Sequence, residues 1–418
     1  MAKIKPFRGL RPPREIAGDL SCLPYDVMNS EEAAKMAEGK ENSLLHITRA
    51  EIDCPPGTDI HSETVYQKAV ANFLKFQKKG WLVGDEEARF YIYAQTMNGR
   101  TQYGIVGAAS CEDYQNGIIR KHELTRPDKE EDRMVLTRHL DANIEPVFFS
   151  YKAVPEIDAI VDSVVKNQEP AYDFVAEDGF GHHFWPVWDR QMNGEVERLF
   201  ATRVPFTYVA DGHHRTAAAA RIGLERKAQN PDHTGREPYN YFMAVHFPDN
   251  QLQILDYNRV IRDLNGLAES RLLEKLNGSF LVEEMGSEIY KPARIHEFSM
   301  YLSGSWYRLT AREGTFDDAD PIGVLDVTIL SRQVLGPVFD IQDLRTSTRI
   351  DFVGGIRGLG ELQRKVDSGE MKVAFALYPV SMQQLINIAD SGNIMPPKTT
   401  WFEPKLRSGL VVHQLTDS

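Results

Sequence analysis

The sequence predicts an α+β protein built around a mixed β-sheet. Three observations lead to this fold class. Short apolar segments typical of strands alternate with helical patterns along all 418 residues. Asn98-Gly99 separates two such segments and is typical of a β-hairpin turn. Near residue 210 an apolar segment runs through an Asp-Gly turn into an alanine-rich helix, which suits a sheet covered by helices.

Apolar periodicity and turn residues place the individual elements. Helices are predicted where apolar residues recur every three to four positions, and strands where short apolar runs end at turns. The predicted helices cover residues 62–80, 126–140, 213–228, 267–277 and 382–391. The predicted strands cover residues 89–95, 102–108, 146–151, 206–210, 241–246, 306–310 and 373–377.

The helix at 126–140 has a recognisable start. Thr125 can serve as its N-cap, with Asp128 three positions later as in a capping box. Pro127 is tolerated in the first turn, where its missing N–H costs nothing. We therefore expect the Thr125 hydroxyl to cap this helix.

A turn-rich break divides the chain into two predicted regions. The segment FPDNQ at residues 247–251 lies between apolar segments and contains turn formers. Residues 1–248 would form a catalytic α+β region that carries the two motifs described below. Residues 249–418 would form a second α/β region, either separate or packed on the first as one unit.

Composition excludes several classes of protein. Lys and Arg number 48 against 60 Asp and Glu, so the formal charge is −12, which argues against a protein that grips nucleic-acid backbone. Three cysteines without C-x-x-C spacing indicate neither a disulfide framework nor a zinc knuckle. No apolar run approaches the ~20 residues of a membrane helix. We expect a soluble cytoplasmic protein, either a monomer or a homodimer.

The sharpest local signal is the segment DGHHR at residues 211–215, which we call the corner. It joins a predicted strand to a predicted helix, and the first N–H groups of a helix have no partner inside it. His213, His214 and Arg215 beside those donors would make an anion site. Asp211 could cap the helix, orient a histidine or bind a metal ion. The competing interpretation is a capped surface helix whose histidines face solvent.

A second motif, HELTRPDKEEDR, covers residues 122–133. Lys129 and Arg133 are four residues apart and share one face of the predicted helix. His122 and Glu123 precede that helix on a segment that can approach a ligand, and Thr125 follows them. A base and two fixed cations are what phosphoryl transfer asks of a protein. The same residues also fit a solvated helix face.

Two further segments carry candidate binding residues. His46, Arg49 and Glu51 could bind the carboxylate and amine of an amino acid, although incidental charges on a loop explain them equally well. Lys398 follows two prolines that stiffen its loop, which either reaches over a phosphate or only closes the fold.

Four motifs resemble a known family. They are LPYDV at 23–27, HELTRPDKEEDR at 122–133, ADGHHR at 210–215 and MPPKTTWFEPK at 395–405. Together they resemble the family of domain of unknown function 1015, over nearly the whole chain. The corner and its small-residue helix also resemble the ParB/sulfiredoxin-like superfamily, in particular its free serine kinases.

The resemblance implies a phosphotransferase of serine biosynthesis that converts free L-serine to O-phosphoserine. The donor would be pyrophosphate or a nucleotide such as ATP or ADP, with Mg²⁺. His213, His214 and Arg215 would hold the donor phosphates, and Lys129 and Arg133 would offset charge on the transferred group.

The same resemblance implies roles for the acidic residues. Glu123, beside His122, would take the serine hydroxyl proton, with Asp211 as its rival for that role or as a metal ligand. Two other functions stay open: hydrolysis of a phosphoester or anhydride, in which water replaces serine, and a nucleotide-binding regulator of the ParB type.

Overall fold

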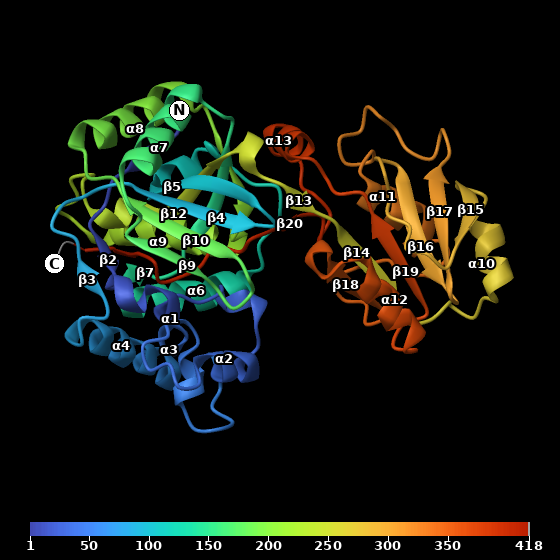
Figure 1. The fold of residues 1–418 in the computed structure, drawn as a ribbon, viewed down its shortest axis with the longest axis horizontal. Coiled ribbons are helices and arrows are strands. Elements are labelled where there is room, and N and C mark those ends of the chain that lie inside the picture. The colour runs from blue at the N-terminus through green and yellow to red at the C-terminus, as the bar shows by residue number, and fades with distance from the viewer. Residues whose placement is uncertain (417–418) are drawn as a thin grey trace. The chain divides into compact units, whose positions relative to one another are not determined.

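The structure, a computed structural model, describes residues 1–416 and divides them into two compact units (Figure 1). Unit 1 comprises Met1–Leu252 and the described residues from Pro404 onward, and unit 2 comprises Gln253–Glu403. The sequence left all of 249–418 in one region. The chain instead returns to unit 1, because strand β21 (Val412–Gln414) pairs with strands β2 (Gly9–Arg11) and β7 (Ala142–Asn143) of that unit.

Unit 1 contains most of the helices and strands that the structure describes. Its helices are α1 (Ala17–Leu20), α2 (Ser30–Ala37), α3 (Leu45–Thr48), α4 (Glu63–Lys78), α5 (Cys111–Gln115), α6 (Pro127–Leu140), α7 (Pro155–Asn167), α8 (Arg190–Arg203) and α9 (His213–Gln229). Its strands, besides β21, are β1 (Ile4–Lys5), β2 (Gly9–Arg11), β3 (Val83–Gly84), β4 (Tyr91–Met97), β5 (Arg100–Ser110), β6 (Ile119–Arg120), β7 (Ala142–Asn143), β8 (Val147–Tyr151), β9 (Tyr172–Val175), β10 (Gly181–Pro186), β11 (Thr207–Asp211) and β12 (Tyr241–Pro248).

A nine-stranded mixed sheet forms the centre of unit 1. Its order is β6-β11-β8-β12-β5-β4-β10-β9, with β1 added beside β5. Strands β11 and β6 are parallel, as are β12 and β8, whereas the other pairs are antiparallel. The predicted α+β class with a mixed sheet is therefore confirmed.

The predicted hairpin is present between β4 and β5. Met97 pairs with Arg100, and the two turn residues have positive φ values of 52° at Asn98 and 76° at Gly99. A two-residue turn with positive φ at both positions follows the right-handed twist of the flanking strands. Local sequence therefore fixes this part of the sheet.

Helices pack on the sheet through small and aromatic side chains. Ala220 of α9 packs with Phe149 of β8 and Val209 of β11 in one buried cluster. Phe200 of α8 packs with Tyr151 in another. Phe149 and Tyr151 are two residues apart on β8 and so face the same side of the sheet. The alanines of α9 thus let its backbone approach the strand that leads into it.

The start of α6 differs from its prediction. Arg126, with φ −99° and ψ 129°, occupies the N-cap position, and no side chain caps the helix there. The Thr125 hydroxyl donates instead to the Glu130 carboxylate. The predicted N-cap is wrong by one residue because Pro127 lies at the first helical position, and a proline disfavours helical backbone at the residue before it.

Unit 2 is an antiparallel sheet with helices. Its six strands follow the order β15-β17-β16-β19-β14-β18, and β13 and β20 form a separate pair. The helices are α10 (Glu269–Leu276), α11 (Asp326–Leu330), α12 (Leu359–Asp367) and α13 (Met382–Asp390). The strands are β13 (Ile254–Leu255), β14 (Tyr257–Ile261), β15 (Phe280–Gly286), β16 (Glu297–Leu302), β17 (Ser305–Ala311), β18 (Ile350–Gly354), β19 (Val373–Leu377) and β20 (Trp401–Phe402).

Candidate functional site

The corner joins β11 to α9 at the end of a strand inside the main sheet. Strand β11 pairs with both β6 and β8, and its register to β8 shifts between Val209 and Asp211. Gly212 then turns the chain with φ +88°, a conformation that glycine adopts without strain. Helix α9 begins directly at His213. The predicted strand–turn–helix is confirmed.

Arg215 is buried one turn into α9, with 7% of its side chain exposed. Its Nη1 donates to the Pro146 carbonyl at 2.6 Å, and its Nη2 lies 4.0 Å from carboxylate oxygens of Asp26 and Asp211. Burial by itself lowers the pKa of a guanidinium, but Asp26, Glu145 and Asp211 outweigh it, so the pKa of Arg215 is raised. Arg215 is therefore a fixed positive charge.

The Asp211 carboxylate has a positively charged neighbour on one side. Lys405 Nζ lies 3.3 Å from Asp211 Oδ2. Burial raises the pKa of Asp211, but Lys405 and Arg215 outweigh it, and the net shift is downward. Lys405 belongs to the returning segment, which Gln95 holds by donating to the Lys405 carbonyl at 2.9 Å. Asp211 is thus ionised and weakly basic.

Two histidines and a carboxylate form a compact group beside the corner. The rings of His122 and His213 lie edge to face with centroids 4.5 Å apart. Glu123 Oε2 is 3.7 Å from His213 Nδ1, and 43% of the Glu123 side chain is exposed. Burial lowers the pKa of His122 to about 4 and that of His213 well below its ordinary value. Both imidazoles are therefore neutral at pH 7.

His214 points to a different neighbour from His213. Its Nε2 accepts a hydrogen bond of 3.0 Å from the backbone N–H of Arg126, at the N-cap of α6. The ring is half-buried, and burial lowers its pKa. His214 thus links the starts of the two helices that carry the motifs.

A second charged layer lies behind Arg215. Arg133 donates from Nε and Nη2 to the same oxygen, Oδ2, of Asp132 at 2.9 and 2.6 Å. It also lies 3.5 Å from Glu145 and over the Tyr25 ring at 3.8 Å. The Arg133 side chain is 11% exposed and that of Glu145 6%. Arg133 therefore supports the corner from within and does not face an open site.

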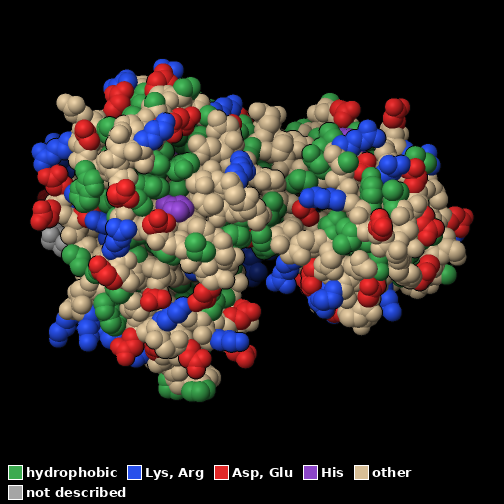
Figure 2. Space-filling model, in the orientation of Figure 1, with side chains coloured by type: hydrophobic (Ala, Val, Ile, Leu, Met, Phe, Trp, Pro, Cys, Tyr) green, Lys and Arg blue, Asp and Glu red, His purple; other side chains and the backbone are tan. Residues whose placement is uncertain are grey.

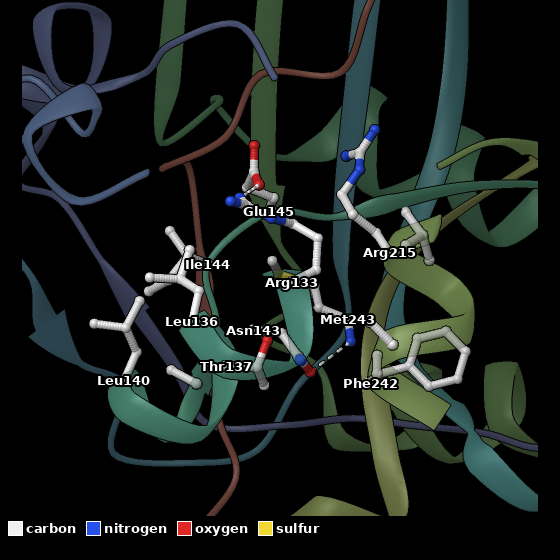
Figure 3. A pocket seen from close by; sticks show the side chains of 14 residues that line it. Arg133, Leu136, Thr137, Leu140, Asn143, Ile144, Glu145, Arg215, Phe242 and Met243 are labelled. Carbon is white, nitrogen blue, oxygen red and sulfur yellow. Dashed lines mark hydrogen bonds and ion pairs between the residues drawn. The ribbon is translucent and has the colours of Figure 1, made fainter. Parts of the chain in front are cut away.

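Arg133, Glu145 and Arg215 line a pocket with apolar residues of α6 and β12 (Figure 3). Its volume is about 40 Å³. A cavity of this size holds a water molecule or two, not a nucleotide. The side chains of Glu123 and Asp26 near the corner are more exposed, at 43% and 42%.

Other predicted site residues lie apart from the corner. Lys129 is exposed on α6, although its charge contributes to lowering the pKa of His214. Thr125 is engaged with Glu130. Lys398 belongs to unit 2, where its carbonyl accepts from Arg259.

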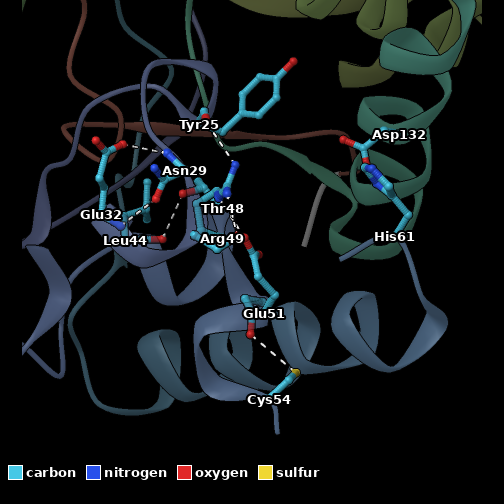
Figure 4. A network of polar contacts seen from close by, with 12 residues as sticks. Tyr25, Asn29, Glu32, Leu44, Thr48, Arg49, Glu51, Cys54, His61 and Asp132 are labelled. Carbon is cyan, nitrogen blue, oxygen red and sulfur yellow. Dashed lines mark hydrogen bonds and ion pairs between the residues drawn. The ribbon is translucent and has the colours of Figure 1, made fainter. Parts of the chain in front are cut away.

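The predicted amino-acid site at residues 46–51 is internally paired. Arg49 Nε lies 2.8 Å from Glu51, and its Nη1 donates to the Tyr25 carbonyl at 3.1 Å (Figure 4). His46 pairs with Asp53 at 2.9 Å. Arg49 thus braces the loop that carries Asp26. Binding of a substrate by these residues stays a prediction.

Sequence reasoning missed Asp26, Glu145 and Lys405 as parts of this site. Asp26 lies in LPYDV and Lys405 at the end of MPPKTTWFEPK, so the motifs behind the family resemblance contained the only signal. Neither residue is near the corner in sequence.

The residues present fit Mg²⁺ poorly. Mg²⁺ prefers oxygen ligands in octahedral geometry. Within the described residues 1–416, the group whose ligand atoms all lie within 4.8 Å of one another is His122, Glu123 and His213, which offers two nitrogens and one carboxylate. Asp211, the predicted metal ligand, is not in it. We therefore derive no catalytic step through Mg²⁺.

Surface charge gives no support to nucleic-acid binding on the face shown in Figure 2. Acidic and basic side chains are interspersed there without a broad basic area. Among residues 1–416, no helix has both the length and the apolar character to cross a membrane.

Comparison with known proteins identifies the family. The family described as "Protein of unknown function (DUF1015)" matches residues 4–328. The chain belongs to the DUF1015 family. This confirms the family resemblance, and the match covers three of the four motifs, whereas the motif at 395–405 lies outside it. No curated protein matches this DUF1015 member significantly.

Several solved structures are similar to this DUF1015 chain at 11% identity. A free serine kinase variant in complex with AMP has a TM-score of 0.36 over 73% of this chain and 92% of its own. A variant in complex with ADP has a TM-score of 0.35 over 74% and 93%. SbnI with a C-terminal truncation, from Staphylococcus aureus, has 0.38 over 73% and 87%.

Proposed function

We propose that this DUF1015 protein is a phosphotransferase that phosphorylates the hydroxyl of free L-serine. The observation that carries the proposal is the corner itself. A buried, permanently charged Arg215 lies at a helix N-terminus, and the partly exposed carboxylate of Glu123 lies beside the first residue of that helix. The resemblance of DGHHR to free serine kinases supplies the identity of the acceptor.

The corner suits the phosphates of a donor. The first N–H groups of α9 have no partner within the helix, and the helix dipole favours an anion there. Arg215 and Lys405 add two positive charges, and both lie close to the carboxylate of Asp211. Charge-assisted hydrogen bonds from such groups match the oxygens of pyrophosphate or of a nucleotide.

Glu123 is the better placed base. A serine hydroxyl is a poor nucleophile at neutral pH, and a carboxylate within reach can take its proton as the bond to phosphorus forms. The serine oxygen bonds to the transferred phosphorus, the bond to the donor's remaining phosphate breaks, and that phosphate leaves with its electron pair. Lys405 holds the pKa of Asp211 low, which makes Asp211 the weaker base.

Two substitutions separate the candidate bases. Glu123→Gln keeps the shape and removes the basicity, so we expect kcat to fall by about 10²- to 10⁴-fold with donor affinity largely retained. Asp211→Asn removes the negative charge beside Lys405 and Arg215 and should change donor affinity instead. Phosphoserine formation is quantified with L-serine in excess, and donor affinity is measured by calorimetry.

Glu131→Gln is the matched control, because Glu131 lies exposed on α6 and pairs with Arg138 at 2.9 Å. Loss of chemistry in Asp211→Asn with near-normal turnover in Glu123→Gln would assign the base to Asp211. Full activity in both variants would contradict the phosphotransfer proposal. Release of phosphate without serine would indicate a hydrolase.

We expect pyrophosphate to be the faster donor. The sequence carries no dinucleotide fingerprint and no other visible adenine-binding signature. Incubation with L-serine and each of pyrophosphate, ADP and ATP, at equal concentrations, tests this order. Faster phosphoserine formation from ADP or ATP would reverse it.

A further inference from the structure

We infer that His122, Glu123 and His213 bind a divalent transition-metal ion of the class Mn²⁺, Fe²⁺, Co²⁺ or Zn²⁺, in preference to Mg²⁺. This goes beyond the proposed function, which uses no step at a metal, and it is tested without any substrate. Two imidazoles and one carboxylate are ligands that such ions accept.

The three residues converge from two separate segments. His122 and Glu123 precede α6, and His213 opens α9. One ligand atom of each lies within 4.8 Å of the others. Bonds of about 2.0–2.2 Å place ligand atoms about 3–3.5 Å apart. Glu123 Oε2 and His213 Nδ1, at 3.7 Å, are already close to that separation. Glu123, the most exposed of the three, is the side chain with room to move.

Burial gives a second, independent indication. His122 is 1% exposed and His213 is 7% exposed. The Nε2 atom of His213 is buried and has no hydrogen-bond partner among the described residues. Buried polar atoms in proteins almost always have a partner, and an orphaned one calls for an unseen ion or water. A metal ion or a water molecule would supply the missing partner of Nε2, while Nδ1 of the same ring is the nitrogen that lies 3.7 Å from Glu123 Oε2.

The chemistry of the donor set decides between metals. Mg²⁺ takes oxygen ligands, whereas imidazole suits zinc, iron and other first-row ions. Three protein ligands leave at least one position for water or a phosphate oxygen. A carboxylate binds through one oxygen or two. If Glu123 binds the ion through one oxygen, its other oxygen can still accept the serine hydroxyl proton. If it binds through both oxygens, it cannot.

His214 provides a matched control. It neighbours His213 in sequence, but its Nε2 already accepts from the backbone N–H of Arg126. It is not part of the compact group. If metal binding were non-specific, replacing His214 would weaken it as much as replacing His213. If the three residues form a specific site, only the replacement of His213 should weaken it.

The experiment uses the purified full chain after removal of any affinity tag and bound metal. Mn²⁺, Co²⁺ and Zn²⁺ are each dialysed to equilibrium with and without excess Mg²⁺, and bound metal is quantified by mass spectrometry. We expect one ion per chain that excess Mg²⁺ does not displace. His213→Asn and Glu123→Gln should weaken binding by at least about 10-fold, and His214→Asn should not.

Cobalt gives a direct readout of the ligands. Its visible absorption bands depend on the atoms bound, so His213→Asn should change the spectrum while His214→Asn preserves it. Glu123→Gln alters a partly exposed side chain and keeps the test valid even if the buried His213 variant fails to fold. No bound ion, displacement by Mg²⁺, or equal loss in His214→Asn and Glu123→Gln would overturn the inference.

Discussion

Arg215 is buried and charged, so we expect its substitution to have a large effect on donor binding at the corner. Its guanidinium is 7% exposed, and carboxylates of Asp26 and Asp211 lie 4.0 Å away. Hydrogen bonds to charged groups contribute about 1.5–3 kcal/mol each. Arg215→Ala should therefore weaken donor binding by about 10- to 100-fold, measured by calorimetry with pyrophosphate.

Arg221→Ala is the control for this change. Arg221 lies on the same helix, but it is 49% exposed and pairs with Glu130 at 2.9 Å. We expect its donor affinity to match that of the unmodified chain. If Arg215→Ala remains folded by circular dichroism and binds pyrophosphate as tightly as before, the corner does not hold the donor.

At the scale of the element, the turn before α9 depends on glycine. Gly212 has φ +88°, and a Cβ placed there would lie 3.3 Å from the Arg215 guanidinium. A left-handed conformation costs an L-residue roughly 1–2 kcal/mol. Gly212→Ala should lower the free energy of unfolding by about that amount and also weaken donor binding, because the guanidinium must move.

Gly194→Ala is the control for Gly212→Ala. It shows how the loss of a glycine alone, outside this turn, changes the free energy of unfolding. Gly194 lies exposed within α8, and a Cβ there meets no atom within 4 Å. Alanine is the better helix former by roughly 0.5–1 kcal/mol, so this variant should be as stable as the original or more so. Chemical denaturation of both variants gives the comparison. Equal stability of the two would contradict the assigned role of Gly212.

At the scale of the whole molecule, the chain from residue 404 onward belongs to unit 1. Strand β21 lies between β2 and β7, and Val412, Leu410 and Leu406 are at most 3% exposed. Burying such side chains contributes about 1.5–3 kcal/mol each, so together they rival the 5–15 kcal/mol stability of a typical domain. A chain ending at residue 403 should therefore fail to fold in unit 1.

Limited proteolysis and circular dichroism of that shortened chain provide the measurement. Val412→Asp should reproduce part of the loss, because it buries a charge in the centre of the small sheet. Val83→Asp is its control, since Val83 is 53% exposed on the edge strand β3. A shortened chain with native resistance to protease would show that the returning segment is dispensable.

The sequence alone determined the local elements and the corner. Every predicted helix and strand coincides with an observed one to within two residues at each end, but many elements were not predicted, among them helices α7 and α8 of 13 and 14 residues. The hairpin at Asn98-Gly99 and the Asp211-Gly212 turn depend on neighbouring residues only. The position of His213 and Arg215 in the first turn of α9 likewise follows from the local sequence.

Only the tertiary structure decided which residues complete the site. Lys405 meets Asp211 across 194 positions of sequence, and Asp26 approaches Arg215 from the other end of the chain. Arg133 was expected to face a ligand, yet it is held by Asp132 and Glu145 behind the corner. Such contacts depend on strand order and on the return of the chain to unit 1, which periodicity and turn chemistry do not encode.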